Sequence, residues 1–296
     1  MRNAFTVDVE DFFQVAAFRR QVAVEQWPQF TLRVVDNTLR VLDWMECRQI
    51  LGTFFVLGWV AERAPALVRE ILHRGHEVAS HGYGHQLIYE IGPDRFRLDV
   101  RRARQILEDA GGEKICGYRA PSYSITARSL WALDILIEEG FTWDSSIYPI
   151  IHDLYGIPGG NRFLHWIQRP AGQIREFPIT TYELRLARAR VRLPVGGGGY
   201  LRLLPAPWIR RAFEKINQEE GQPAILYFHP WEIDPQQPRI QAPWRSRFRH
   251  YLNLERTFGK LDYLVRHLPF APVREVLAAV EGQERTAFRC HGVAHA

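Results

Sequence analysis

The sequence predicts an α/β protein in which parallel strands are covered by helices. Short apolar runs that suit buried strands alternate with segments whose apolar residues recur at helical spacing, and this alternation fills the first half of the chain. Repeated strand and helix units favour a (β/α) barrel or an open doubly wound sheet. The 296 residues, 46% hydrophobic and 12% aromatic, are sufficient for a packed core.

The expected strands are apolar, β-branched or aromatic runs bounded by turn residues. The first, Phe5 to Asp11, ends in three acids, and the others cover 51–56, 77–80, 141–144, 174–179 and 223–228. In α/β proteins, functional sites are built at the carboxyl ends of such strands. We therefore expect the acids after the first strand, the histidines after 77–80 and His229 after the last strand to share one edge.

The expected helices carry apolar stripes, and three of the five end at glycine. They cover 31–44, 65–72, a segment capped by Asp94 and ending at Gly111, a segment capped by Thr126 and ending at Gly140, and 252–268. Proline and glycine interrupt the pattern at 150–210, where Gly196 to Gly199 indicate a backbone that bends or approaches another segment closely. We expect a catalytic barrel over 1–235, which includes this insertion, and a helical extension over 236–296.

Two histidines four residues apart, His81 and His85, can hold one metal ion between their imidazoles. Two imidazoles and one carboxylate, with open positions for water and substrate, are typical of catalytic zinc sites. Such an ion activates water for hydrolysis of an amide or ester. Asp8 can serve as the base for the water and His229 as the acid for the leaving amine.

Six segments follow one another in an order typical of a known family: Thr6 to Asp11, Thr53 to Gly58, Ser80 to His85, Gly117 to Ser122, Asp144 to Ser146 and Leu226 to Glu232. Taken together, they resemble the NodB-homology polysaccharide deacetylases, a carbohydrate esterase family. The glycine run from Pro194 to Tyr200 is similar to that of the subgroup found with exosortase-linked exopolysaccharide genes. The resemblance implies a distorted (β/α) barrel with fewer than eight regular strands.

The resemblance also implies a role for each site residue. Asp8 would be the base, oriented by Arg119, while Asp144 would hydrogen-bond to the acid His229 and tune it. His81 and His85 would bind the metal ion, most simply zinc. The backbone N–H near Ser122 would donate to the oxyanion, and Ser122, Tyr123 and Trp231 would line the substrate cleft.

Two positions depart from the family pattern. The family usually has two adjacent aspartates in its first motif, whereas Val9 follows Asp8 here. Strand alternation places Glu10 on the face of Asp8, which favours Glu10 as the third metal ligand, and Asp11 remains the alternative if the strand bulges or ends early. Ser122 also stands where an aromatic residue is common.

These features predict a metal-dependent deacetylase that hydrolyses N-acetyl groups on hexosamine units of a polysaccharide or its precursor, in exopolysaccharide biosynthesis. The alternatives are hydrolysis of another group (an O-acetyl ester, an N-formyl amino sugar or a small cyclic amide) and a catalytically silent glycan-binding protein. The expected partner is an N-acetylated or lipid-linked glycan, with no nucleic acid.

Composition bounds the cellular setting. Three scattered cysteines fit a reducing compartment, and neither a leader pattern nor a membrane span is seen, so we expect a cytoplasmic protein, with peripheral membrane attachment left open. The net charge of +5 comes from arginine rather than from the three lysines. This surplus indicates an acidic polymer or an anionic membrane as a partner, or an arginine bias with no ligand implied.

Overall fold

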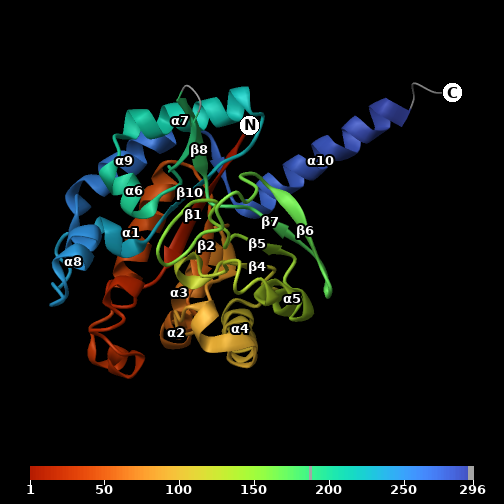
Figure 1. Cartoon of the computed structure of the whole chain (residues 1–296). Helices are drawn as coiled ribbons and strands as arrows, with labels where there is room; N and C mark the ends of the chain where they lie inside the picture. The colour runs from red at the N-terminus through yellow and green to blue at the C-terminus, as the bar shows by residue number, and fades with distance from the viewer. Residues whose placement is uncertain (187–188, 293–296) are drawn as a thin grey trace.

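The computed structural model describes residues 1–186 and 189–292 and has a curled, mostly parallel sheet at its centre (Figure 1). The strand order is β10 (Ile225–Phe228), β1 (Asn3–Val9), β2 (Thr53–Val56), β3 (Glu77–Ser80), β4 (Gly117–Tyr118), β5 (Trp143–Asp144), β7 (Gly172–Glu176) and β6 (His165–Arg169). All pairings on this path are parallel except that of β6 with β7. The described sheet ends at β10 and β6, so it is a half-barrel, and the predicted fold class is confirmed.

Helices cover the outer face of the sheet, and strand alternation divides the apolar residues between two layers. Phe54 and Val56 of β2 lie in the core between the sheet and the helices, whereas Phe55 joins an inner cluster with Trp143 and Tyr227. The covering helices are α1 (Val34–Cys47), α2 (Gly58–Arg63), α3 (Pro65–His73), α4 (Ile88–Gly111) and α5 (Trp131–Glu138) (Figure 1). Side chains on the inner face of β1 therefore point into the half-barrel.

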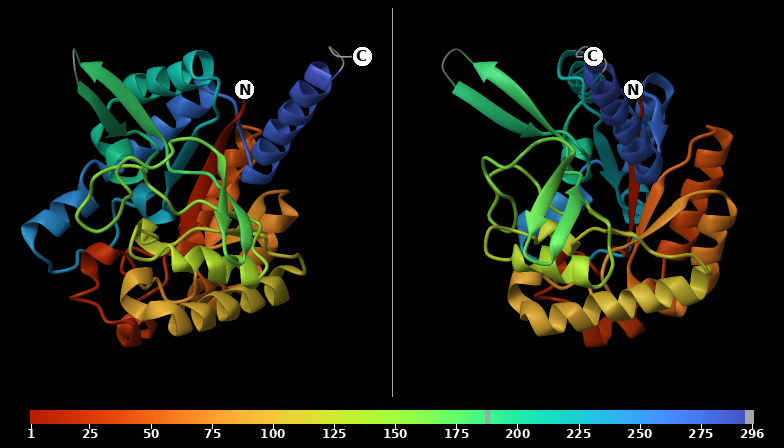
Figure 2. Two further views of the ribbon diagram at one scale, coloured as in Figure 1. Left: turned by 45° about the vertical axis from the view of Figure 1, so that its right-hand side comes forward. Right: turned by 90° about the vertical axis from the view of Figure 1, so that its right-hand side faces the viewer.

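The second half of the chain adds the remaining elements. A hairpin of β8 (Thr181–Leu186) and β9 (Ala189–Pro194) precedes α6 (Gly198–Leu203) and α7 (Ala206–Glu219). After β10 come α8 (Trp244–Tyr251), α9 (Leu254–His267), the short β11 (Phe270–Ala271), which pairs with β1, and α10 (Val273–Gly292). Figure 2 shows α10 extending away from the body of the molecule. No helix of the described residues has the length and apolarity needed to cross a bilayer.

One predicted helix start was wrong, and another needs an addition. The helix expected to be capped by Thr126 begins at Trp131, because the Thr126 amide donates to the Ser129 hydroxyl, which itself donates to the Ser124 carbonyl, so this segment is a closed turn. The helix expected after Asp94 is present, but a short helical turn from Ile88 precedes it, and the two are separated by a kink at Gly92, whose φ of 76° is not helical.

The glycine run packs against the edge of the sheet. The Tyr227 amide of β10 donates to the Gly196 carbonyl at 2.7 Å, and Gly197 forms a parallel bridge with Tyr227. A Cβ atom on Gly197, where φ is +150°, would lie 1.8 Å from the Tyr227 carbonyl oxygen. The run therefore lets the chain touch β10 and then begin α6, which explains the glycines as a close approach of two backbones.

Candidate active site

The candidate metal site lies at the carboxyl ends of β1 and β3. Glu10 follows β1, and His81 and His85 follow β3, and one ligand atom of each lies within 4.8 Å of the others. Glu10 Oε2 is 2.6 Å from His85 Nε2 and accepts no hydrogen bond, although it is buried. Among the described residues, this is the one such group of three or more metal-ligating side chains.

The protonation states in this group suit a divalent ion. His81 Nδ1 donates to the Arg119 carbonyl at 2.9 Å, which leaves the Nε2 lone pair free. Burial lowers the pKa of His81 to about 4, so the ring is neutral at pH 7. Burial alone would raise the pKa of Glu10, but His85, His229 and His81 together lower it, so Glu10 is ionised. A buried, ionised carboxylate grouped with the neutral His81 ring fits a metal site.

Asp99 of α4 fixes the loop that carries both histidines. Its carboxylate accepts the Tyr83 amide at 2.9 Å and the Gly84 amide at 3.1 Å. Gly82 has a φ of +72°, and a Cβ atom there would lie 2.8 Å from Asp99 Oδ1. The loop is therefore tied to α4 at its two central amides, an anchor that sequence reasoning missed because Asp99 belongs to no motif.

Asp11, the alternative third ligand, is used elsewhere. Its Oδ1 accepts the Phe12 amide, and its Oδ2 accepts the Arg33 and Val34 amides at 2.7 and 2.9 Å. These last two amides open α1, so Asp11 caps that helix from a distance. Burial raises the pKa of Asp11 to about 6 against these bonds. The structure thus brings Glu10, and not Asp11, to the two histidines.

Asp8, the candidate base, lies beside the metal group and is held by Arg119. Arg119 Nη1 donates to Asp8 Oδ1 at 2.6 Å and to Thr6 Oγ1 at 2.9 Å, and neither Asp8 nor Arg119 is more than 2% exposed. The guanidinium lies 3.9 Å from the centre of the Phe55 ring. Because Arg119 extends from β4 across the inner face to β1, it leaves Asp8 Oδ2 free to face His229.

His229, the candidate acid, is oriented by Glu232. His229 Nδ1 donates to Glu232 Oε1 at 2.6 Å, and its Nε2 lies 3.8 Å from Asp8 Oδ2 and 3.5 Å from Glu10 Oε1. Burial would lower the pKa of His229, but Glu10, Glu232 and Asp8 raise it to about 9, so both ring nitrogens are protonated at pH 7. Arg202 of α6 donates to Glu232 Oε2 at 2.6 Å, and both are buried.

Asp144, expected to bond to His229, makes other contacts instead. Its Oδ1 accepts the Ser146 hydroxyl at 2.5 Å, and its carboxyl lies against that of Glu176. Burial raises the pKa of Asp144 to about 6. Burial, and after it the neighbouring Asp144 carboxylate, raises the pKa of Glu176 well above its usual value. The strand order separates β5 from β10, which carries His229, so the partner of His229 comes instead from the turn that follows it.

Of the three residues expected to contact substrate, Trp231 and Tyr123 are buried and Ser122 is partly exposed. Trp231 is 5% exposed, stacks on His229 with ring centroids 5.1 Å apart, and donates from Nε1 to Glu10 Oε1 at 3.2 Å. Trp231 therefore packs against the candidate acid His229 and donates to the candidate ligand Glu10, and its side chain is buried. Ser122 and Tyr123 both have positive φ, 51° and 53°, a strained conformation found at functional turns. Tyr123 is buried against the Tyr227 ring, so Ser122 is the more accessible of the two.

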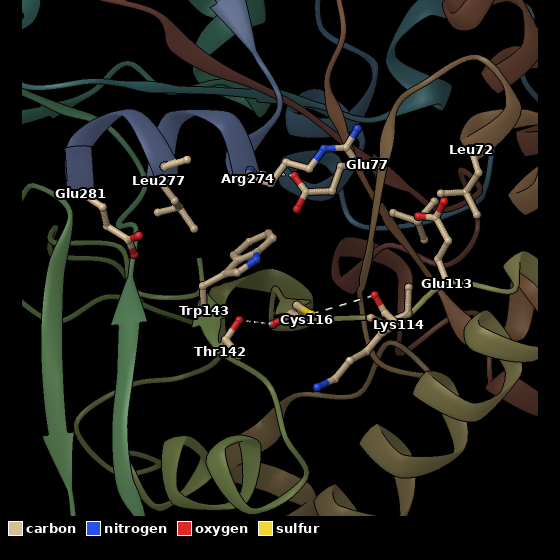
Figure 3. Close-up of a pocket in the computed structure, with 13 residues that line it drawn as sticks. Leu72, Glu77, Glu113, Lys114, Cys116, Thr142, Trp143, Arg274, Leu277 and Glu281 are labelled. Carbon is tan, nitrogen blue, oxygen red and sulfur yellow. Dashed lines mark hydrogen bonds between the residues drawn. The ribbon is translucent and has the colours of Figure 1, made fainter. Parts of the chain in front are cut away.

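A separate hollow of about 410 Å³ lies at the other end of the sheet (Figure 3). Figure 3 shows Glu77, Cys116 and Trp143 beneath the first turns of α10, where Arg274 and Leu277 face them. Glu77 accepts the Thr53 hydroxyl and the Arg274 amide, so it anchors the start of α10. This hollow lies where the start of α10 packs on the sheet, and it contains none of the candidate catalytic side chains.

The fold and the ligand group define a class: an α/β half-barrel with a His/His/Glu group suited to a divalent ion. Residues 27–136 match the family model for polysaccharide deacetylase, and residues 145–278 match a domain of unknown function, DUF3473. The chain therefore contains a polysaccharide deacetylase domain of the NodB-homology type with a DUF3473 extension.

Curated relatives agree with this domain. The chain is similar to a peptidoglycan-N-acetylglucosamine deacetylase of Bacillus cereus, at 30% identity over 101 residues, which is 34% of this chain and 37% of the relative. It is also similar to a chitooligosaccharide deacetylase of Sinorhizobium fredii, at 34% identity over 33% of this chain and 44% of the relative. The matches span from 33% to 60% of the length of the curated relatives.

Solved structures share the fold. A Mycobacterium smegmatis protein classed with the polysaccharide deacetylases has a TM-score of 0.61 at 19% identity, over 95% of this chain and 90% of that one. The allantoinase PuuE has a TM-score of 0.57 at 14% identity, over 92% of this chain and 87% of that one. At these identities the likeness concerns the fold alone.

Proposed function

We propose that this protein is a metal-dependent deacetylase that removes N-acetyl groups from hexosamine units of a polysaccharide or of its precursor. The observation that carries the proposal is the meeting of a buried acid, a protonated imidazole and a His/His/Glu group within a few ångströms. Amide hydrolysis needs a base for water, an acid for the amine and a stabilised oxyanion. The described site offers a candidate for each.

Glu10, His81 and His85 would hold the metal ion, with zinc the simplest choice for this ligand set. A divalent ion bound there would polarise the acetamide carbonyl and lower the pKa of water. Asp8 would take the proton from water while Arg119 holds its other oxygen. The amide at Ser122 would donate to the developing oxyanion.

His229 would then give a proton to the leaving amine. Its Nε2 faces Asp8 and Glu10, and its Nδ1 is held by Glu232, so the donating nitrogen is fixed toward the reacting groups. Because the pKa of His229 is raised to about 9, the acid form is present at neutral pH. Protonation of the amine makes it a competent leaving group.

Acetate release from an N-acetylated chito-oligosaccharide tests the proposal. We expect release by the native protein, loss with a chelator and return with added zinc, and at least 100-fold slower release by Asp8→Asn and His229→Gln. Release that a chelator leaves unchanged would refute the metal mechanism. Binding of the sugar without release of any acyl group would favour a silent glycan-binding protein.

The choice of acyl group is open to the same assay. Parallel reactions with an O-acetylated sugar, an N-formyl amino sugar and a small cyclic amide compare the three alternative substrates directly. We expect the N-acetylated sugar to give the highest kcat/KM. The exosortase-associated subgroup and the exopolysaccharide role remain part of the proposal and rest on the glycine run, and deletion of the gene with analysis of the secreted polymer would test them.

A further inference from the structure

Helix α8 presents two exposed aromatic side chains one turn apart. Trp244 is 71% exposed and Phe248 is 56% exposed, and they are among the most exposed large apolar residues described. Figure 2 shows α8 projecting from the edge of the body. Residues four apart lie on the same side of a helix, so the two rings form one stripe. Burial in the core does not explain them.

Arginines flank this stripe on both sides. At about 100° per residue, Arg245 and Arg249 lie on one side of the Trp244 and Phe248 stripe, and Arg247 lies on the other. All three are exposed, and none forms an ion pair with a described carboxylate. The sequence from 235 to 254 contains no acid but also includes Arg239, so this segment carries no negative charge of its own to offset its arginines.

The buried side of α8 leads to the active site. His250 is 2% exposed and stacks on Trp231 with ring centroids 4.1 Å apart, and Trp231 stacks in turn on His229. Arg202, which holds Glu232, also donates to the His250 carbonyl at 2.6 Å. The aromatic and basic face of α8 therefore lies on an element that borders the candidate catalytic acid.

We propose that α8 is a docking surface for an anionic lipid bilayer, with the plane of Trp244 and Phe248 entering the headgroup layer. A stripe of aromatic residues between arginines is the arrangement of helices that lie in a membrane interface. A projecting helix edge suits a flat surface, and the exposed arginines complement an anionic one. Docking by this face would bring the neighbouring site to glycans attached to lipid.

Vesicle sedimentation of the full chain tests the proposal. The probes are vesicles of phosphatidylcholine alone and vesicles in which about one third of the lipid is phosphatidylglycerol. We expect binding to the anionic vesicles only, reduced by salt. Arg239, Arg245 and Arg247 replaced together by Gln should lower the partition coefficient by on the order of 100-fold. Trp244→Ser with Phe248→Ser should lower it by roughly tenfold or more.

A matched control lies on α4, where Leu98 is 65% exposed and Arg95 is also exposed. Leu98→Ser with Arg95→Gln should bind vesicles as the native chain does. Near-ultraviolet circular dichroism and acetate release from a soluble substrate check that each variant is folded. Native protein that stays in the supernatant, or α8 variants that sediment like the control, would overturn the proposal. Retention on an acidic polysaccharide without vesicle binding would replace it with a polymer site.

This experiment is independent of catalysis. Vesicle binding without acetate release would leave the docking surface standing while the proposed function fails. Acetate release without vesicle binding would do the reverse. The two proposals can therefore be refuted separately.

Discussion

Substitution of Glu232 by Gln should shift the pH range over which the protein is active. The carboxylate of Glu232 accepts the Nδ1 proton of His229 at 2.6 Å and is one of the groups that raise the pKa of His229 to about 9. A hydrogen bond to a charged group contributes about 1.5–3 kcal/mol, and about 1.4 kcal/mol corresponds to one pKa unit. Removing the charge should therefore lower the pKa of His229 by about 1–2 units.

The sign follows from the role of His229 as an acid. The rate falls as pH rises through the pKa of His229, because the amine then leaves without a proton. In Glu232→Gln the fall of kcat at high pH (the alkaline limb) should therefore begin about 1–2 pH units lower. The rise of kcat at low pH is set by other groups and should not move. Native and variant are compared at saturating zinc, so the effect of the ion on His229 is common to both.

The measurement is kcat against pH for acetate release from a soluble N-acetylated chito-oligosaccharide. Asp144→Asn is the matched control, because Asp144 bonds to Ser146 and makes no described contact with His229. Gln keeps an oxygen that can accept from the buried Arg202, and urea unfolding checks that the variant is folded. An alkaline limb that stays in place in Glu232→Gln, or that moves in Asp144→Asn, would refute the assignment.

Three further predictions concern the metal ligand, the glycine run and the buried acid pair. Glu10→Gln should weaken zinc binding by more than about 100-fold in a competition titration, whereas Asp11→Asn should keep zinc affinity and lose about 1 kcal/mol of folding stability as a helix cap. Gly197→Ala should cost roughly 1–3 kcal/mol in urea unfolding from backbone strain, and more because its Cβ would lie 1.8 Å from the Tyr227 carbonyl oxygen. Gly199→Ala, whose Cβ would meet only Arg202 at 3.8 Å, should be harmless. The pKa of Glu176 in the folded protein lies above its ordinary value of 4.5, so the native protein loses folding stability as the pH rises past 4.5. The free energy of unfolding of Glu176→Gln should therefore increase relative to that of the native protein as the pH rises. A difference between the two that does not change with pH would contradict this.

The sequence was most informative where the alternation of side chains along a strand decides on which face of the sheet a residue lies. Asp8 lies on the inner face of β1 because Phe5 and Val7 are buried on the other. Glu10, the first residue after β1, lies with the two histidines, on the side that continued alternation predicts. The positions of β2, β3 and β10 were also predicted well, because these strands are continuous buried runs, whereas the short β4 and the strands β6, β8, β9 and β11 were not predicted. The parity of a strand and the burial of its residues depend on local sequence.

Contacts between distant segments could not be predicted in the same way. Asp99 holds the histidine loop from a helix sixteen residues downstream of Tyr83, and nothing in its neighbourhood marks it. Glu232 did leave a signal, since it follows His229 by three residues in a turn begun by Pro230, which is the spacing of a capping box. Family resemblance pointed to Asp144 instead, and only the three-dimensional arrangement of β5 and β10 separates the two.

The division of the candidate site gives the DUF3473 extension a part in the proposed catalysis. The segment matching polysaccharide deacetylase, 27–136, contains His81, His85 and Arg119, whereas His229, Glu232 and Arg202 all lie within 145–278. The close approach at Gly197 lets α6 begin beside β10, and α6 carries Arg202 to Glu232. A chain ending before 145 would keep the proposed ligands of the ion but lose the proton donor, so the extension supplies half of the chemistry that we propose.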